Sequence, residues 1–148
     1  MSRLHLHISV DDVEKNILFY SALFGAQPTK VEDDYAKWQL DDPKVNFAIS
    51  NRSEVKGVDH VGIQTESTEE LTELEERLTA AGISGVAQES STCCYAESEK
   101  YWTFDPQGIP WETFHTLSSA AVFKLDTNED NGSSCCAPEN ISSQSSCC

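Results

Sequence analysis

Two adjacent cysteines, Cys93 and Cys94, stand in the segment 91–95, which reads Ser-Thr-Cys-Cys-Tyr. Neighbouring cysteines cannot close a relaxed disulfide with each other, because the peptide that joins them imposes a strained ring. They can offer two soft sulfur ligands to one thiophilic centre, and thiolates favour such partners over hard cations. The pair therefore indicates binding of a soft metal ion or a metalloid.

The remaining four cysteines also form adjacent pairs, Cys135-Cys136 and Cys147-Cys148. One interpretation of six cysteines is a secreted disulfide scaffold. The N-terminus, however, has no apolar signal segment, and no stretch is long enough to cross a membrane, so we expect a cytoplasmic protein with reduced thiols. A structural zinc site typically spaces its cysteines about two to four residues apart, and adjacent pairs do not match that spacing.

The composition argues against nucleic acid as a partner. The 148 residues carry a net charge of -15, whereas phosphate binding requires clustered lysines and arginines. A hydrophobic content of 39% is enough for a core in one compact domain. Much of the acidity falls between Glu66 and Glu76, where Leu71, Leu74 and Leu78 recur at helical spacing, so we expect these acids on the solvent face of a helix.

The composition changes near Leu117. Beyond Leu125 the chain is rich in Ser, Asn and Asp and has almost no apolar side chains to bury, which is typical of disorder. We therefore predict a folded domain over residues 1–117 and a disordered tail over residues 118–148. The tail pairs Cys135, Cys136, Cys147 and Cys148 are candidate auxiliary sites for the same soft metal or metalloid.

The predicted folded part contains an internal repeat. In its first half, residues 4–10 alternate as a strand, Asp11 or Asp12 can cap the helix that follows, and Gly25 ends that helix. The apolar residues of this helix predict a core-facing stripe of Val13, Ile17, Phe19, Tyr20, Leu23 and Phe24.

The second half begins in the same order. Residues 59–64 form a predicted strand, Ser67 or Thr68 can cap the next helix, the helix continues over residues 71–78, and Gly82 stops it. His5 and His60 occupy equivalent positions on the first strands of the two halves.

Extended segments follow each predicted helix, at residues 36–40 and 45–49 and then at 91–95, 101–104 and 111–114. The repeating unit is therefore strand, helix and about three strands. We predict an α+β fold in which two βαβββ modules, about 1–54 and 55–117, form a half-open, barrel-like mixed sheet with a cavity on its concave face.

The motifs of both halves resemble those of a known superfamily. His5 lies seven residues before Asp12, which opens the sequence Asp-Val-Glu-Lys-Asn-Ile-Leu-Phe-Tyr. This pattern resembles the first module of the vicinal oxygen chelate superfamily, which includes glyoxalase, bleomycin-resistance and extradiol dioxygenase proteins. Residues 59–63 (Asp-His-Val-Gly-Ile) and 105–112 (Asp-Pro-Gln-Gly-Ile-Pro-Trp-Glu) resemble its second module. Within the superfamily, segment 91–95 and the tail pairs resemble ArsI-type carbon–arsenic lyases and cadmium-induced CadI-type proteins.

The resemblance implies a metal site made by His5, His60 and Glu112. Two imidazoles and one carboxylate form the facial triad of non-haem Fe(II) oxygenases, which leaves positions for substrate and dioxygen. Glyoxalase-type isomerases usually have a second carboxylate from the first module, and the matching stretch at residues 45–49 has no acid. The missing acid favours an oxygenase over an isomerase.

Other interpretations of these residues stay open. His7 lies on the same side of its strand as His5, so either could be the ligand, although the spacing to Asp12 favours His5. A lone histidine on a strand is more often a hydrogen-bonded polar side chain than a ligand. Glu112 stands among aromatic residues, where a buried carboxylate needs a partner such as a metal. His115 would face the other side of that strand.

The resemblance implies an Fe(II)- and O2-dependent carbon–arsenic lyase that serves organoarsenical detoxification. Cys93 and Cys94 would hold a trivalent organoarsenical, methylarsenite or an aromatic arsenical, beside the iron, and activated oxygen would cleave its C–As bond to release arsenite. Two alternatives stay open: a protein that sequesters cadmium or arsenic without catalysis, and a glyoxalase-like isomerase or drug-sequestering protein of the same fold. The expected partner is a small organoarsenical or a soft metal ion, without nucleic acid or membrane. Pairing of two chains as a homodimer is left open.

Overall fold

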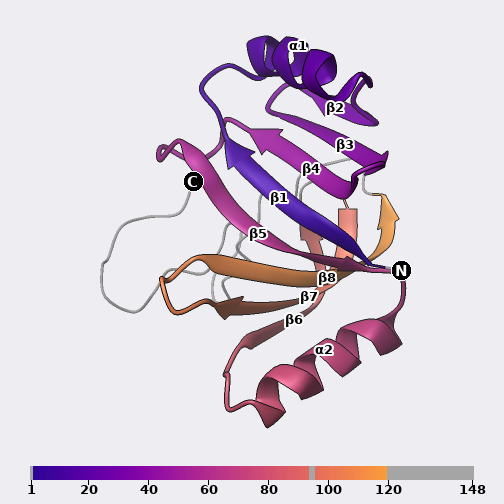
Figure 1. Cartoon of the computed structure of the whole chain (residues 1–148), viewed down its shortest axis with the longest axis vertical. Coiled ribbons are helices and arrows are strands. Elements are labelled where there is room, and N and C mark those ends of the chain that lie inside the picture. Colours follow the sequence, from indigo (N-terminus) through magenta and orange to yellow (C-terminus); the bar gives the residue numbers. More distant parts are fainter. Residues whose placement is uncertain (1, 94–95, 120–148) are drawn as a thin grey trace.

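The protein forms one curved, eight-stranded sheet flanked by two helices (Figure 1). The computed structural model describes residues 2–93 and 96–119, and for residues 89–93, 96, 97, 118 and 119 it gives the backbone alone. In chain order the elements are β1 (Arg3–Ser9), α1 (Val13–Phe24), β2 (Lys30–Glu32), β3 (Tyr35–Asp41), β4 (Lys44–Ser50), β5 (Gly57–Thr65), α2 (Thr68–Ala80), β6 (Val86–Cys93), β7 (Ala96–Phe104) and β8 (Pro110–Ser119). The predicted βαβββ order, used twice, is confirmed.

The strand order is β2-β3-β4-β1-β5-β8-β7-β6. Each βαβββ unit contributes four neighbouring strands, with one parallel pair in each unit, β1 with β4 and β5 with β8. The two units join through the antiparallel pair of β1 and β5 at the centre. Because β2 and β6 end the sheet on opposite sides, the sheet does not close, and the predicted half-open, barrel-like mixed sheet is confirmed. None of the described helices has the length and apolar character needed to span a membrane.

Helix α1 closes the main core of the first unit. The Asp12 side chain caps its N-terminus by accepting a hydrogen bond from the Lys15 backbone, and Gly25 ends it with a φ of 64°. The helix packs against β3 and β4. Its core is strongly aromatic, with these residues in contact: Val13, Ile17, Tyr20, Phe24, Trp38, Phe47 and Ile49.

The predicted apolar stripe of α1 was too wide. Phe19 and Leu23 are 60% and 63% exposed, whereas Tyr20 and Phe24 pack on the core. Residues 13, 17, 20 and 24 fall on one face of a helix with 3.6 residues per turn, and residues 19 and 23 fall beside it. Hydrophobicity alone did not separate the two faces.

Helix α2 packs more loosely on the second unit. Ser67 caps it by accepting a hydrogen bond from the Glu70 backbone, and Leu71 is its only fully buried described residue. Glu73 and Glu76 are exposed, as predicted for a solvent-facing acidic side. Between α2 and the sheet lies an apolar pocket of about 310 Å3, whose lining includes Ile63, Leu74, Leu78, Ile83 and Trp111.

Candidate metal site

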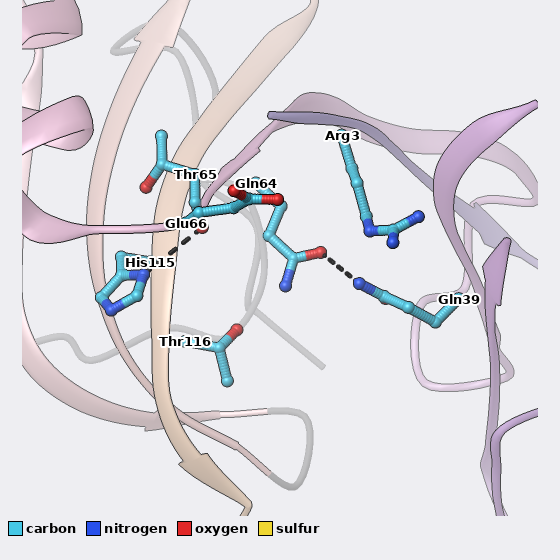
Figure 2. Close-up of a pocket in the computed structure, with 7 residues that line it drawn as sticks. All are labelled: Arg3, Gln39, Gln64, Thr65, Glu66, His115 and Thr116. Carbon is cyan, nitrogen blue, oxygen red and sulfur yellow. Dashed lines mark hydrogen bonds between the residues drawn. The ribbon is translucent and has the colours of Figure 1, made fainter. Parts of the chain in front are cut away.

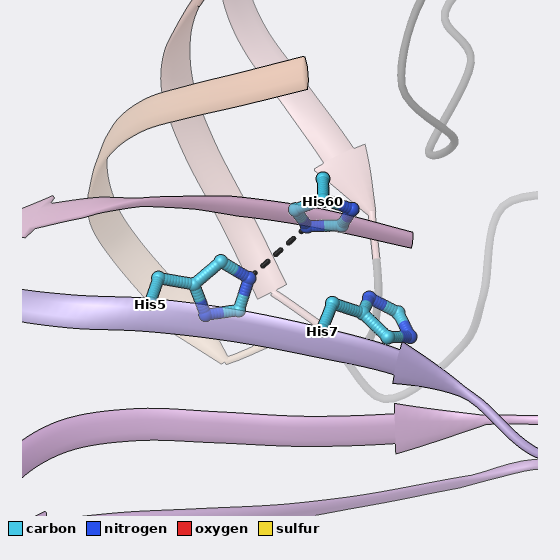
Figure 3. Close-up of side chains that lie close together, drawn as sticks. All are labelled: His5, His7 and His60. Carbon is cyan, nitrogen blue, oxygen red and sulfur yellow. Dashed lines mark hydrogen bonds between the residues drawn. The ribbon is translucent and has the colours of Figure 1, made fainter. Parts of the chain in front are cut away.

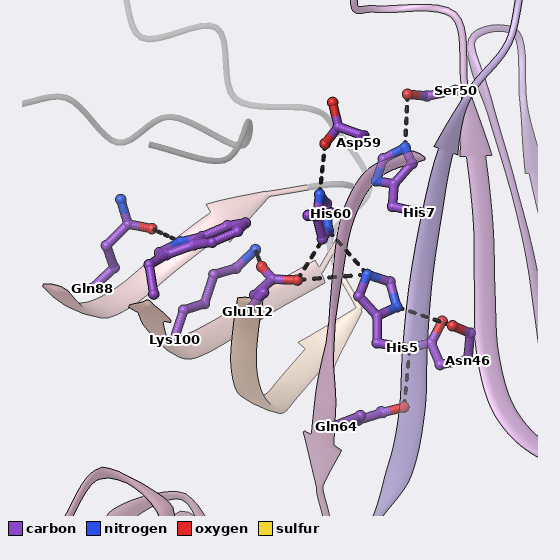
Figure 4. A network of polar contacts seen from close by, with 11 residues as sticks. His5, His7, Asn46, Ser50, Asp59, His60, Gln64, Gln88, Lys100 and Glu112 are labelled. Carbon is purple, nitrogen blue, oxygen red and sulfur yellow. Dashed lines mark hydrogen bonds and ion pairs between the residues drawn. The ribbon is translucent and has the colours of Figure 1, made fainter. Parts of the chain in front are cut away.

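Three neighbouring strands bring His5, His60 and Glu112 together on the concave face (Figure 4). On β5, Gly62 pairs with His5 of β1 on one side and with Glu112 of β8 on the other. A Cβ atom at position 62 would lie 1.9 Å from the carbonyl oxygen of Glu112. Only glycine therefore permits this close approach of β5 to the strand that carries Glu112.

The three side chains present one donor atom each to a common point. His5 Nε2 lies 3.1 Å from His60 Nε2 and 3.6 Å from Glu112 Oε2, and His60 Nε2 lies 3.3 Å from Glu112 Oε2. Ligands bound at about 2.1 Å to one metal ion lie about 3.0 Å apart at right angles and about 3.4 Å apart at tetrahedral angles. The spacing of the donor atoms therefore fits a single first-row metal ion.

Hydrogen bonds at the far side of each ring fix which nitrogen faces the cluster. His60 Nδ1 lies 2.6 Å from an Asp59 carboxylate oxygen, and His5 Nδ1 lies 3.0 Å from the Asn46 carbonyl oxygen. A carboxylate and a carbonyl can only accept, so both Nδ1 atoms carry the hydrogen. Such partners are typical of histidines that bind metals, because they leave the Nε2 lone pair free to bind.

Three electron pairs therefore converge inside a buried cluster. His5, His60 and Glu112 are 6%, 2% and 3% exposed, so water does not screen the repulsion between them. A proton or a metal ion would relieve that repulsion. Burial and the neighbouring His60 lower the pKa of His5 to about 4. Burial would also lower the pKa of His60, but hydrogen bonds to Asp59 and Glu112 outweigh burial and raise it above 6.5.

Glu112 has a second buried partner, Lys100 of β7. Lys100 is 7% exposed, and its Nζ forms an ion pair with Glu112 Oε1, the oxygen that does not face the histidines. Burial alone would raise the pKa of Glu112, but the Lys100 ammonium and His60 hold it well below its ordinary value. The carboxylate is therefore ionised in the form that binds metals.

His7 offers an alternative third donor (Figure 3). One ring nitrogen from each of His5, His7 and His60 lies within 4.8 Å of the others, and all three rings are buried. His7 Nε2, however, lies 2.9 Å from the Ser50 hydroxyl, and burial lowers the pKa of His7 well below 6.5. The atoms of the His5, His60 and Glu112 set converge more closely, at no more than 3.6 Å, so that set is the better candidate.

Two residues of this cluster, Asp59 and Lys100, were not predicted from the sequence. Asp59 stood in the predicted strand without a role; neighbouring strand residues usually point to opposite faces, so alternation does not indicate its contact with His60. Lys100 lay outside the predicted strand at residues 101–104, whereas β7 begins at Ala96. Continuing the alternation back from Trp102 would have placed Lys100 on the same face as the cluster.

Aromatic side chains wall the cluster. The Trp102 ring centroid lies 5.2 Å from that of His60, and the Phe114 ring centroid lies 5.1 Å from that of His5. Trp102 thus belongs to the cavity wall, whereas Trp38 belongs to the core. His115, which was not expected in the site, turns away and lies 3.3 Å from the Thr65 carbonyl oxygen.

A polar pocket of about 260 Å3 adjoins the cluster (Figure 2). Gln64 links the two regions, because its side-chain oxygen accepts hydrogen bonds from Asn46 at 3.0 Å and from Gln39 at 2.9 Å. Asn46 also provides the carbonyl that orients His5. The lining consists of Arg3, Gln39, Gln64, Thr65, Glu66, His115 and Thr116.

The predicted cysteine sites are largely outside the described residues. Cys93 is the last residue of β6, where its backbone pairs with Ala96 of β7. Its side chain is not described, and Cys94 lies outside the described residues, as do the tail residues Cys135, Cys136, Cys147 and Cys148. Binding of a metalloid by these thiols stays a prediction.

Two βαβββ units that share one sheet, with a metal-ligand cluster on its concave face, define the class of protein. Residues 3–113 match the Glyoxalase/Bleomycin resistance protein/Dioxygenase superfamily, and the chain belongs to this superfamily. An extradiol ring-cleaving dioxygenase from B. fuscum shares the fold, with a TM-score of 0.60 and 15% identity over 80% of this chain and 33% of that one.

Closer relatives narrow the comparison. The chain is 42% identical to a trivalent organoarsenical cleaving enzyme of Bacillus sp. (strain MD1), over 100% of this chain and 91% of the relative. It is 33% identical to the cadmium-induced protein CadI of Mycobacterium bovis, over 92% of this chain and 93% of the relative. Both resemblances that the cysteine pairs indicated are confirmed.

Proposed function

We propose that the protein cleaves the carbon–arsenic bond of trivalent organoarsenicals, using Fe(II) held by His5, His60 and Glu112 and dioxygen as co-substrate. The observation that supports this most strongly is the convergence of three donor atoms within 3.6 Å on the concave face. The 42% identity to an enzyme named for organoarsenical cleavage supports the substrate class.

The donor set suits this cofactor. Two imidazoles and one carboxylate are the ligands of non-haem Fe(II) oxygenases, and the bound iron would supply dioxygen activation. Asp59 and the Asn46 carbonyl hold both imidazoles in the metal-binding tautomer. The matching segment of β4, residues 45–49, has no acid where an isomerase of this superfamily would carry one.

The thiols Cys93 and Cys94 would capture the substrate. Trivalent arsenic condenses with two thiols: each As–S bond that forms replaces an As–OH bond and releases one water. Capture makes the following oxidation effectively unimolecular. The backbone of Cys93 ends β6 beside β7, the strand that carries Lys100. The tail pairs Cys135, Cys136, Cys147 and Cys148 would act as auxiliary sites that raise the local concentration of arsenical.

The overall reaction balances with dioxygen as the sole oxidant. For methylarsenite, CH3As(OH)2 + O2 gives As(OH)3 + CH2O, so the C–As bond breaks, the methyl carbon is oxidised to formaldehyde and both oxygen atoms enter the products. Arsenic remains trivalent throughout. The protein's share of this reaction is to place the C–As bond near the metal site and to exclude water from it.

A second function is favoured by the cadmium-induced relatives and by the cysteine pairs. In that function the thiols bind cadmium or arsenite stoichiometrically, and the histidine–carboxylate cluster takes no part in turnover. The metal site would then be dispensable for protection against the metalloid, which separates this function from the first.

Anaerobically purified protein, loaded with Fe(II) and given methylarsenite and air, tests the proposal by arsenic speciation. We expect arsenite and formaldehyde in a one-to-one ratio, and no product without iron or without oxygen. The Cys93→Ser and Cys94→Ser variants should retain iron and lose turnover. Loss of free methylarsenite without arsenite, at one equivalent or fewer per dithiol, would instead establish sequestration.

A further inference from the structure

Lys100 is a lysine buried in the sheet beside the candidate ligands. Its side chain is 7% exposed, as is rare for a lysine, and its ammonium is paired with a Glu112 carboxylate that is 4% exposed. Figure 4 shows Lys100 approaching Glu112 from the side opposite the two histidines. The proposed reaction assigns no role to this side chain.

The two oxygens of Glu112 have different partners. Oε2 lies 3.3 Å from His60 Nε2 and 3.6 Å from His5 Nε2, so it belongs to the donor cluster. Oε1 is held by Lys100. A carboxylate that binds a metal through both oxygens would have to turn Oε1 away from the ammonium, which would leave the buried Lys100 charge without this partner.

We propose that Lys100 is a positioning residue that fixes Glu112 as a one-oxygen metal ligand and so keeps an additional coordination position open. This inference rests on the metal-binding part of the proposed function. A position that a second carboxylate oxygen would fill is instead available to a small ligand, such as dioxygen or an oxygen or sulfur atom of the substrate.

A lysine at position 100 is suited to hold Oε1 of Glu112 while Oε2 stays with the histidines. An ammonium is a compact point charge with three rotatable hydrogens, so it can hold one oxygen of a carboxylate without engaging the other. A guanidinium presents a planar fork that favours both oxygens of a carboxylate at once, which would draw Oε2 away from the histidines. Lysine and arginine therefore carry the same charge but have opposite consequences for Oε2.

The alternative role for Lys100 is that of a counter-charge alone, which would neutralise buried Glu112 without affecting metal coordination. Two variants separate these roles. Lys100→Met keeps much of the aliphatic stem and removes the donor, and Lys100→Arg keeps the charge and changes its geometry. Lys56→Met is the matched control, because Lys56 is an exposed lysine that pairs with Asp11 and not with Glu112.

The test is Co(II) substitution, read by visible absorption and by metal titration. In Lys100→Met we expect Oε1 to join the metal, with a rise in coordination number and at least a twofold fall in visible absorptivity. In Lys100→Arg we expect Co(II) affinity to fall at least tenfold. Lys56→Met should match the wild type in both. A wild-type spectrum in Lys100→Met together with wild-type affinity in Lys100→Arg would overturn the proposal.

The wild-type protein itself gives a second measurement that does not depend on the folding of a variant. The infrared difference spectrum between Co(II)-loaded and metal-free protein, assigned with Glu112→Gln, reports the splitting of the carboxylate stretches. A splitting wider than that of free carboxylate, typical of one-oxygen binding, supports the inference, and a narrower one overturns it. Protein that gives this spectrum but releases no arsenite with Fe(II) would refute the proposed function and leave the role of Lys100 standing.

Discussion

Helix α1 closes a dense aromatic core against β3 and β4, whereas helix α2 leaves an apolar pocket of about 310 Å3 between itself and the sheet. On the concave face it is the second unit that contributes more, since it supplies most of the side chains of the cluster. The first unit contributes His5 and the amide Asn46 to the cluster, whereas the second contributes His60, Asp59, Lys100 and Glu112. The two units thus repeat one backbone order, while dense packing is concentrated in the first and charged chemistry in the second.

A repeated fold therefore need not repeat its side-chain roles. The two units share one sheet through the pairing of β1 with β5, so the buried charges of the second unit lie beside the packed first unit. Buried charges are costly unless they are paired, and those of the second unit are paired with each other.

The largest expected difference between the units is the loss of metal affinity when Glu112 of β8 or Asn46 of β4 is replaced. Glu112→Ala removes a proposed ligand, so metal affinity should fall by more than about 100-fold, the upper range for loss of an outer-shell partner. Asn46→Ala should cost less than about tenfold, because the backbone carbonyl at position 46, and not the side chain, holds His5. Co(II) titration of both variants provides the measurement. Equal losses would show that the first unit participates in the chemistry as much as the second.

The denser core of the first unit should show in the free energy of unfolding. Phe47 is 4% exposed and lies among Tyr20, Phe24 and Trp38, so Phe47→Ala should lower the free energy of unfolding by about 3–5 kcal/mol. Leu71→Ala should cost only about 2 kcal/mol, the low end for loss of a buried leucine, because Leu71 is the only buried described residue of α2 and so has few buried neighbours on its own helix. Urea unfolding of metal-free protein compares them. A larger loss for Leu71→Ala would contradict the assignment of the main core to the first unit.

The histidines of the two units should respond to pH in opposite directions. The pKa of His5 is lowered to about 4 and that of His7 is also lowered, so between pH 6.5 and 4 the unfolded chain binds protons that the folded chain does not. Stability of the metal-free protein should therefore fall by roughly 3 kcal/mol for His5 alone as the pH drops across that window. His60, with a raised pKa, contributes stability that is full below pH 6.5 and is lost as the pH rises through its folded pKa.

Urea unfolding at a series of pH values measures both trends. His5→Gln should flatten the loss of stability between pH 6.5 and 4, and His60→Gln should remove the loss on the alkaline side. An unchanged pH dependence in His5→Gln would mean that this imidazole is protonated in the folded protein.

The smallest expected effects are equal in the two units. Asp12 caps α1 and Ser67 caps α2, each by accepting one backbone hydrogen bond. Asp12→Ala and Ser67→Ala should each lower the free energy of unfolding by about 1 kcal/mol. A clear inequality, measured by thermal unfolding, would show that the units differ in helix termini as well as in packing.

Much of the fold could be predicted from periodicity. Alternation located β1 and β5, and the helical spacing of Leu71, Leu74 and Leu78 located α2 with its exposed acids. The three-residue strand β2 (Lys30–Glu32) was not predicted as a separate strand, because so short an edge strand carries no alternation. The exposure of Phe19 and Leu23 was missed because their hydrophobicity resembles that of the core residues beside them.

The candidate site could be predicted only in part. The positions of His5, His60 and Glu112 followed from family motifs, and the structure brings their donor atoms together. Lys100 and Asp59 could not be assigned, because their roles depend on which partner lies across the sheet or beside the ring. Strand register determines this, and one residue of register error would point Lys100 to the opposite face.

X-ray absorption at the iron edge of anaerobic, Fe(II)-loaded protein, before any arsenical is added, shows which side chains bind the iron. We predict a shell of nitrogen and oxygen donors at about 2.1 Å with scattering from two imidazoles, corresponding to His5 and His60 beside the Glu112 carboxylate. A shell dominated by sulfur, or scattering from three imidazoles, would place the iron on the cysteines or on His7 and refute the proposed His5, His60 and Glu112 site.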